Sequence, residues 1–277
     1  MHPVDTAPRL DGEEYLELSD LLYHLRAARL AVRVAGGRLC RSLPRLGRTA
    51  SWLRQLPVLE VELGNSPAGR SIAEALTARR GLLPGTLAAA VLELPRDPAA
   101  YLVGRSRQAV RTGLNHARRE GFTVLKVTDD DERRARALEL VDADIDDDHR
   151  PALRAWAADP RDESWFAVDA AGRTRAVQIL SVDGSVARLN AMISAGGDMR
   201  SPVRYLLSAR AFTDLIEGGV SAVVLEGALF LSPGLRHFQR LLGFRPMNIA
   251  LRRRPAGTDE APVTAVPDRL LAAVATA

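Results

Sequence analysis

The stretch RLNAMISAGGDMRSPVRYLL, residues 188–207, carries the strongest structural signal in the sequence. Its first half alternates as a strand does, glycines follow as a turn, and Ser201-Pro202 is typical of a helix start. The free backbone N–H groups at such a start point at one spot, which favours an anion. Arg200 and Arg204 flank this spot, and arginine binds phosphate oxygens in a fork. The stretch therefore predicts a phosphate-binding turn, although an ordinary strand-to-helix connection would show the same pattern.

The composition is that of a globular protein. With 277 residues, of which 47% are hydrophobic, the chain is long enough for one large domain or two modest ones. No apolar run approaches the roughly 20 residues that a membrane span needs, and the N-terminus lacks the apolar segment of a signal peptide. We therefore expect a cytoplasmic protein. Cys40 is the only cysteine, so it has no partner for an internal disulfide and is expected simply to pack.

Arginine supplies almost all of the positive charge, because Lys126 is the only lysine among 38 basic residues. Residues 21–59 hold several arginines and no acid, whereas residues 129–148 are strongly acidic, so the net charge of +4 hides a polarised molecule. Such basic surfaces can bind the phosphates of nucleic acid or an anionic membrane. A helix that packs one face and wets the other would look the same.

Strands and helices alternate in the first half of the predicted structure. The expected order is a helix at 13–33, a second basic helix at about 48–56, a strand at 58–63, a Ser-Pro helix from 66 or 69 to 80, a strand at 86–94, a long basic helix at 97–120, a strand at 122–127, an acidic helix at 129–147 and a helical turn at 151–158.

A meander of three strands begins the second half. It is expected at 165–169, 175–182 and 186–194, and Asp183-Gly184 is a strong hairpin signal. A helix to Gly218, a strand at 222–229, a helix from Ser232-Pro233 to Gly243 and a strand at 248–252 follow. The tail beyond residue 255 is rich in Ala, Pro and Thr, and we assign it no chemistry.

This order of elements resembles the GNAT superfamily of N-acyltransferases over about residues 122–254. The resemblance is carried by the strand-turn-helix at 190–207, by Leu225-Glu226-Gly227 at a strand end, and by HFQRLLGF at 237–244, which is similar to the family's final helix. It implies an α/β fold with a mixed sheet and a donor pyrophosphate in the turn before the central helix. The acyl thioester is then expected in a gap where the strands at 186–194 and 222–228 separate.

The resemblance also implies a division of the chain. We expect a basic helical N-terminal segment at 1–55, a partial α/β lobe with a basic helix at 56–121, a GNAT-like core at 122–256 and a tail at 257–277. Residues 58–76 and 189–207 each read as a strand leading to a Ser-Pro helix, as a decayed duplication would leave them. Two independent uses of a common device would give the same echo.

The turn departs from the family's Arg/Gln-x-x-Gly-x-Gly/Ala pattern. Asp198, Ser201 and Val203 stand at those slots, without the close approach that glycines permit. Gln239 stands where the family often has a tyrosine that protonates the leaving thiolate, and Tyr205 replaces it only if it faces the gap. Fem-type aminoacyl transferases, a branch that keeps the fold without the glycine pattern, resemble the chain better.

Acyl transfer to an amine needs a site for the donor's phosphates, polarisation of the carbonyl group and removal of a proton from the amine. Backbone N–H groups near residues 192–194 are expected to polarise the carbonyl. The candidate donor-binding residues are Met192, Ser194, Gly197, Arg200, Ser201 and Arg204.

Glu226 follows three apolar residues and is the candidate base, with a pKa raised by desolvation; a carboxylate paired with an arginine is the alternative. His237 is a second candidate base, or a partly buried packing residue. Tyr205 is the candidate acid. Asn190 alternates in phase with Met192 and Ser194, so all three are expected to share a face, with Asn190 on the acceptor side.

Asp146 and Asp147 are further candidate acceptor residues, in an acidic lip that attracts a cationic amine. A solvated helix end is the alternative. A calcium loop starting at Asp142 does not fit, because its sixth position is Asp147 and its twelfth is Leu153. The scattered histidines predict no metal site.

These features favour an N-acyltransferase that uses an acyl-CoA donor and a small-molecule amine or peptide acceptor. A Fem-type enzyme that takes aminoacyl-tRNA, with the arginine-rich surfaces on the tRNA, is the second reading. A non-catalytic binding module on a degenerate acyltransferase fold is the third, and the missing glycines and Gln239 favour it.

Overall fold

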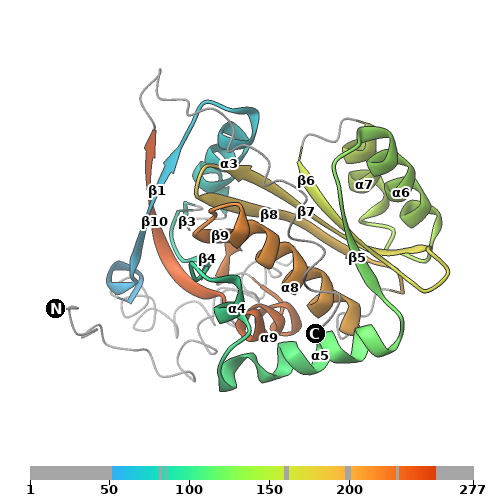
Figure 1. The fold of residues 1–277 in the computed structure, drawn as a ribbon. Coiled ribbons are helices and arrows are strands. Elements are labelled where there is room, and N and C mark those ends of the chain that lie inside the picture. The colour runs from blue at the N-terminus through green and yellow to red at the C-terminus, as the bar shows by residue number, and fades with distance from the viewer. Residues whose placement is uncertain are drawn as a thin grey trace, which may run out of the picture.

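The computed structural model describes residues 52–253 except 81–82, 85, 159–161, 197–200 and 229–230. One mixed sheet of eight strands, in the order β1-β10-β4-β9-β8-β7-β6-β5, organises this part of the chain (Figure 1). Its strands are β1 (Val58–Leu63), β4 (Ala89–Glu93), β5 (Thr123–Val127), β6 (Glu163–Val168), β7 (Thr174–Asp183), β8 (Val186–Ser194), β9 (Ala222–Gly227) and β10 (Arg245–Arg253). The short strands β2 (Arg79–Arg80) and β3 (Leu83–Pro84) form a separate pair.

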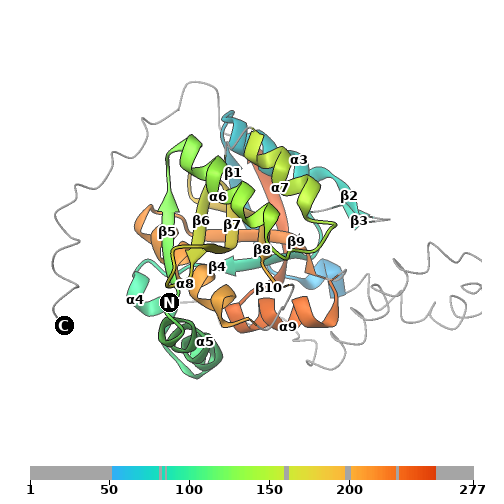
Figure 2. The same cartoon turned by 90° about the vertical axis from the view of Figure 1, so that its right-hand side faces the viewer.

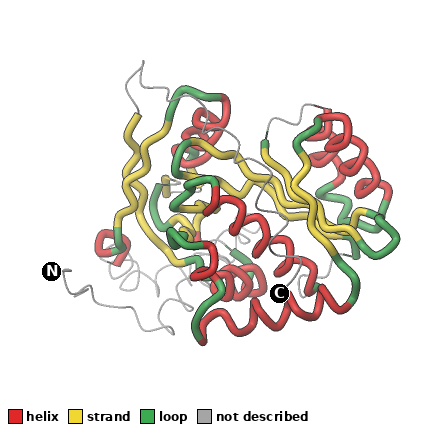
Figure 3. The backbone as a smooth tube through the Cα atoms, in the orientation of Figure 1, coloured by secondary structure: helices red, strands yellow, loops and turns green. Residues whose placement is uncertain are grey.

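Helices cover both faces of the sheet, which lies as a layer between them (Figures 2 and 3). They are α3 (Pro67–Thr77), α4 (Pro98–Tyr101), the 3-10 turn η1 (Arg105–Arg107), α5 (Gln108–Arg119), α6 (Asp130–Asp142), α7 (Arg150–Ala158), α8 (Pro202–Glu217) and α9 (Pro233–Leu242). Helices α8, α5 and α9 lie on one face, which we call the α8 face. Helices α3, α6 and α7 lie on the other, which we call the α3 face.

The meander is apolar on both sides because both sides are covered. In β7, Leu180 packs in the cluster beneath α8, whereas its neighbour Ile179 packs beneath α6 and α7. Antiparallel pairing joins β6 to β7 and β7 to β8, as the predicted three-stranded meander requires, and it also joins β5 to β6. Helix α8 is buried nearly all round, with Leu207 and Phe212 fully inaccessible, because it lies between the sheet and α5.

Two predicted helices are wrong in extent. The basic helix expected over 97–120 is interrupted between α4 and α5, where Gly104 has a φ of 95°, a left-handed conformation that suits glycine. Arg111 closes this break by donating hydrogen bonds to the carbonyl oxygens of Leu102 at 2.6 Å and Gly104 at 2.8 Å. The acidic helix expected over 129–147 already ends at Asp142.

The boundary predicted at residue 121 does not separate two sheets. Strand β4, from the expected lobe, lies between β9 and β10 of the expected core and pairs antiparallel with both. Strand β1 pairs parallel with β10 at the sheet edge. The predicted helix at 13–33, Cys40, the tail and residues 48–51 of the helix predicted at 48–56 lie outside the described residues. Residues 52–55 of that helix are helical.

No helix in the described part of the chain is long and apolar enough to cross a membrane. Within the same residues, no three His, Cys, Asp or Glu side chains are grouped as metal ligands would be.

Candidate functional site

Strands β8 and β9 run parallel and separate after three residue pairs. The pairing covers Val186 with Ala222, Ala187 with Val223 and Arg188 with Val224, and no further pair joins these strands among the described residues. Both strands continue, β8 to Ser194 and β9 to Gly227. The gap that the family resemblance implied is therefore present between these strands.

A bulge in each strand lies just beyond the last pair. In β8, Leu189 faces Leu180 and Ala191 faces Ile179, so Asn190 is an extra residue relative to β7. In β9, Leu225 faces Ala90 and Gly227 faces Ala89, so residue 226 is extra relative to β4. A bulge bends its strand and increases the local twist, and this provides a physical cause for the separation of the strands.

Ala88 adds a strained position beside the β9 bulge. Its φ is 48°, and it is the only described residue other than glycine with a positive φ. Two hydrogen bonds hold it there: its N–H donates to Asn248 Oδ1 at 3.1 Å, and its carbonyl oxygen accepts from the N–H of Ala228 at 2.7 Å. Strained backbone of this kind tends to collect at functional sites.

The bulge corrects the prediction that Asn190, Met192 and Ser194 share a face. Because Asn190 is the extra residue, the alternation shifts by one position. Asn190 lies on the α3 face, where its Nδ2 donates to Ser181 Oγ at 2.8 Å. Met192 packs against the cluster beneath α8, and Ser194 contacts Arg204 of α8.

Asn190 belongs to a directional chain of hydrogen bonds on the α3 face. Arg188 Nη1 donates to Asn190 Oδ1 at 2.6 Å, and Asn190 in turn donates to Ser181. Ser181 Oγ then donates to Asp162 Oδ1 at 2.6 Å. The chain is polarised from a guanidinium to a carboxylate, and it lies beside the point where β8 and β9 separate. Sequence reasoning missed Ser181 and Asp162.

Arg204 lies at the interface between α8 and the sheet. Only 7% of it is exposed, and its Nε donates to Ser194 Oγ at 3.0 Å. Two of the six predicted donor-binding residues, Ser194 and Arg204, are therefore in contact, with Arg204 oriented toward the end of β8. Ser201 is the N-cap of α8, but its side chain makes no capping hydrogen bond. Gly197 and Arg200 lie outside the described residues.

Tyr205, the next residue along α8, points the opposite way, toward α5. Its ring lies 5.2 Å from that of Phe238 between centroids and contacts the backbone of Gly113. Burial raises the pKa of Tyr205. Because its side chain faces α5 rather than the sheet, the condition for Tyr205 to act as the acid in the gap is not met.

The other two predicted catalytic residues lie on different elements. Glu226 is the bulged residue of β9, so the backbone places it at the gap. His237 lies on the exposed face of α9, with its Nδ1 3.4 Å from Arg240 Nη2, whereas Phe238 and Gln239 of the same helix are buried. Met192 and Ser194 thus lie on the α8 side of β8 beyond its last pair with β9, and the backbone of residue 226 lies beside the same gap. His237 lies at the surface.

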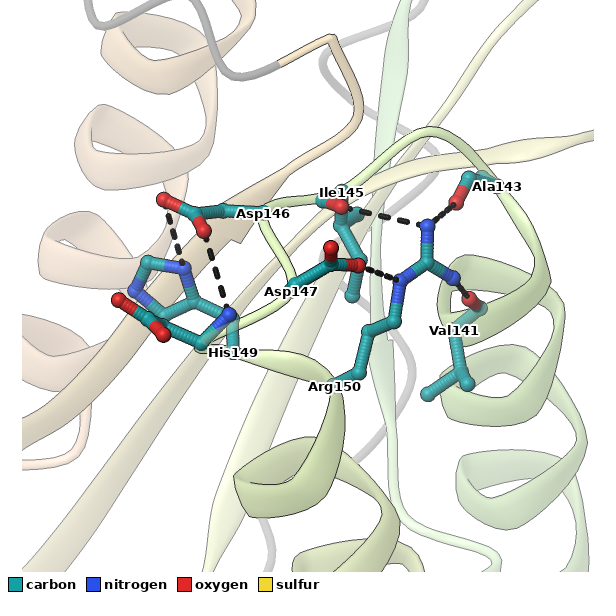
Figure 4. A network of polar contacts seen from close by, with 8 residues as sticks. Val141, Ala143, Ile145, Asp146, Asp147, His149 and Arg150 are labelled. Carbon is teal, nitrogen blue, oxygen red and sulfur yellow. Dashed lines mark hydrogen bonds and ion pairs between the residues drawn. The ribbon is translucent and has the colours of Figure 1, made fainter.

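The acidic segment at residues 143–149 connects α6 to α7, and Arg150 holds this connection in shape (Figure 4). Arg150 donates to the carbonyl oxygens of Val141, Ala143 and Ile145, and its Nε lies 3.1 Å from Asp147 Oδ1. Asp146 Oδ1 accepts from the N–H of Asp148 at 3.2 Å, and its other oxygen lies 3.9 Å from His149 Nδ1.

This acidic connection lies beside the end of β8. The carbonyl oxygen of Asp144 accepts a hydrogen bond from the N–H of Gly196 at 2.5 Å, and Gly196 opens the turn that leads to α8. Asp146 and Asp147 have 61% and 95% of their side chains exposed. Both carboxylates are therefore accessible to solvent near the start of this turn, with Asp147 beside Arg150 and Asp146 beside His149, and an acidic lip that attracts an amine stays a prediction.

One signal in the sequence could have revealed the bulge. Asparagine is depleted in strand interiors, and Asn190 stands in the middle of an otherwise apolar strand. No sequence pattern links Asp162 to Ser181, because the two residues meet only through the pairing of β6 with β7.

Comparison with known proteins finds similarity at the level of the fold. No family model and no curated protein matches the chain. FemX is 12% identical, with a TM-score of 0.44 over 61% of this chain and 62% of that one. The C-terminal domain of a proposed lysylphosphatidylglycerol synthetase from Agrobacterium fabrum is 16% identical, with a TM-score of 0.43 over 57% of each chain.

A GCN5-related N-acetyltransferase from Kribbella flavida is also 16% identical, with a TM-score of 0.35 over 58% of this chain and 54% of that one. The chain thus covers less than two thirds of the length of each of these proteins. Its own topology has an antiparallel meander whose last strand, β8, leads into α8 and pairs in parallel with β9, the strand that follows α8, before the two separate. This order agrees with the GNAT-like fold that the sequence predicts.

Proposed function

We propose that the protein is an N-acyltransferase that moves an acyl group from a CoA-type donor to an amine. The observation that carries the proposal is the separation of β8 from β9 between two bulges. Among the described residues, the backbone N–H and C=O groups that point from one strand toward the other have no strand partner there. An extended thioester arm can satisfy these groups as an added strand does.

The side chains around the gap suit the steps of acyl transfer. The start of α8, with Ser201 and the proposed Gly197 and Arg200, receives the phosphates of the donor, and Arg204 contributes positive charge behind them. Glu226 takes a proton from the amine as its nitrogen attacks the thioester carbonyl. The C–S bond breaks, and the thiolate leaves with a proton from solvent.

The acceptor approaches from the α3 face in this proposal. Asn190, tied to Ser181 and Asp162, lines that side of β8, and the exposed carboxylates of Asp146 and Asp147 attract a cationic amine or an amino group of a peptide.

Donor binding is the first test. Isothermal titration with coenzyme A and with short and long acyl-CoA species should show saturable binding. Met192→Trp fills the α8 side of the gap and should weaken this binding about tenfold or more, whereas Val58→Trp, at an exposed position of the edge strand β1, should not. No binding across the panel would exclude a CoA donor.

Catalysis is tested separately through Glu226. The variant Glu226→Gln should bind acyl-CoA normally but release thiol from it far more slowly in the presence of amine acceptors. Binding without turnover in the native protein, over a broad panel of amines, would favour the non-catalytic binding module.

A Fem-type donor, aminoacyl-tRNA, is the second candidate because a row of exposed basic side chains runs along η1 and α5. The row consists of Arg105, His116, Arg118 and Arg119. Binding of tRNA should weaken steeply with salt, and the double charge reversal Arg118→Glu with Arg119→Glu should reduce it. Arg107 and Arg111 are unsuitable for this test because they bind carbonyl oxygens within the fold.

A further inference from the structure

A pocket of about 620 Å³ opens on the outer side of α8, away from the sheet. Helix α5 and η1 form one wall, and the first turns of α8 and the end of α9 form the other. Its polar lining comes from Arg105, Ser106, Gln108, Thr112, His116 and Tyr205. None of these residues takes part in the gap between β8 and β9.

The Tyr205 ring lines the pocket and is held in place by two neighbouring helices. A Cβ added to Gly113 would lie 2.6 Å from the Tyr205 ring, so only glycine lets α5 approach this closely. Phe238 supports the same ring from α9. The Tyr205 hydroxyl is uncharged at neutral pH, as that of an ordinary tyrosine is, and burial raises its pKa further. A supported, neutral ring of this kind is a stacking surface for a planar group.

The rim of the pocket is basic and rich in hydrogen-bonding groups. Arg105 and His116 are exposed basic side chains, and none of the described residues that line the pocket is acidic. His116 Nε2 lies 3.3 Å from Glu120 Oε1, and Glu120 is not part of the lining. Gln108 and Thr112 add an amide and a hydroxyl group to the lining residues. These groups match a phosphate together with the edge of a polar ring.

The position of the pocket links it to the proposed donor site. Pro202, the first residue of α8, lines it, and Ser201 before it belongs to the turn proposed to bind phosphates. Arg204 and Tyr205 are consecutive, with Arg204 toward the end of β8 and Tyr205 toward the pocket. A donor that enters the gap with its acyl end therefore has its distal end beside the pocket.

We infer that this pocket binds the adenosine nucleotide end of the acyl donor, with the base on Tyr205 and a phosphate between Arg105 and His116. The identity of the ligand rests on the proposed function, because coenzyme A and the 3′ end of aminoacyl-tRNA both carry an adenosine nucleotide. The pocket itself recognises the chemistry that these two donors share.

Two half-ligands separate the pocket from the gap. Adenosine 3′,5′-bisphosphate lacks the thioester arm, and acetyl-pantetheine lacks the nucleotide. We compare their binding by isothermal titration to the native protein, to Thr112→Trp, which fills the pocket from the exposed face of α5, and to Asn115→Trp, an equally exposed control on the same helix outside the lining.

Thr112→Trp should weaken adenosine bisphosphate about tenfold or more and leave acetyl-pantetheine unchanged, whereas Asn115→Trp should change neither. Met192→Trp should have the opposite pattern. Arg105→Ala should weaken the bisphosphate but not adenosine. Unchanged bisphosphate affinity in Thr112→Trp overturns the inference while leaving a CoA donor in place; no binding of either half-ligand, of coenzyme A or of tRNA overturns the inference and the proposed function together.

The source of the nucleotide is decided by two full-length probes. If the donor is an acyl-CoA, Thr112→Trp weakens coenzyme A and tRNA shows no competition with adenosine bisphosphate. If the donor is an aminoacyl-tRNA, a short RNA hairpin ending in CCA competes with the bisphosphate, and removal of its terminal adenosine abolishes the competition. If neither probe competes with adenosine bisphosphate, the assignment of the pocket to a donor is contradicted.

Discussion

Arg107 shows how an arginine of a basic segment serves the fold instead of a ligand. Its Nη1 donates to the carbonyl oxygen of Leu241 at 3.2 Å, and its guanidinium lies 5.1 Å from the centre of the Tyr101 ring. The group fits against Gly243, where a side chain would occupy the same space. Gly243 therefore serves both as the left-handed cap of α9 and as the floor for Arg107.

Gly243→Ala should consequently be more damaging than a change of backbone conformation alone. A φ of 93° costs an L-residue about 1–2 kcal/mol, and displacement of Arg107 adds to this. Gly219→Ala is the control, because its φ of 83° follows α8 in the same way but nothing lies within 4 Å of an added Cβ. In urea denaturation, equal losses in the two variants would show that the Arg107 contact contributes nothing.

The two described tyrosines should titrate abnormally. Burial raises the pKa of Tyr101, partly offset by Arg107, and burial also raises that of Tyr205. The folded state therefore holds both protons more tightly than the unfolded state. This stability is complete below the ordinary tyrosine pKa of about 10 and is lost as the pH rises through the folded-state values. Ultraviolet titration of the native protein, Tyr101→Phe and Tyr205→Phe measures the pKa of each phenol. The prediction is contradicted if each substitution removes only a phenol that titrates at the ordinary pKa.

At the scale of elements, the β7–β8 hairpin is joined to the start of α3 through one carboxylate. Asp183 is buried, and it accepts hydrogen bonds of 2.6 Å from the N–H of Gly64 and from Ser66 Oγ. Ser66 in turn caps α3 by accepting from the N–H of Gly69. The Asp-Gly hairpin signal therefore marks a tertiary contact as well as a turn.

Asp183→Ala should destabilise the protein by about 1–3 kcal/mol, because two donors lose their acceptor. Hydrogen exchange should rise in β1 and α3 before it rises in β6 and β7. The double variant with Ser66→Ala should be less destabilised than the sum of the single changes, because the two side chains share one network. Asp97→Ala, which removes an exposed cap of α4, is the control for the loss of a helix cap elsewhere. Strict additivity of Asp183→Ala and Ser66→Ala would rule out coupling between the hairpin and α3.

Elements were predictable from the sequence where local signals agree. The capping pairs Ser66-Pro67 and Ser232-Pro233 begin α3 and α9, and Asp183-Gly184 makes the hairpin. The breaks at Gly104 and after Asp142 were missed because flanking helix formers mask a single glycine and a charged helix end. The bulge at Asn190 depends on register with β7, so strand alternation alone placed its side chain on the wrong face.

At the scale of the whole molecule, order along the chain did not reveal neighbours in space. Strand β4 precedes the meander by a long stretch of sequence, yet it lies between β9 and β10. Its residues 89–92 are buried because both of its faces and both of its edges are covered. Sequence periodicity indicates burial but not the pairing partner, so the predicted lobe at 56–121 and core at 122–256 merge in one sheet.

A fragment of residues 122–253 should therefore fail to fold cooperatively, whereas residues 52–253 should unfold in one transition. Without β4, the edges of β9 and β10 lose their pairing partner and the buried side chains of Val223 and Val224 lose cover. Asn248 also loses both groups that it binds, the carbonyl oxygen of Leu53 and the N–H of Ala88.

Urea denaturation followed by circular dichroism measures the transitions, and adding a separate 52–121 fragment should restore cooperativity. A cooperative transition of the shorter fragment alone would show that the core predicted from the family resemblance is an independent domain, and that β4 adds only an edge to it.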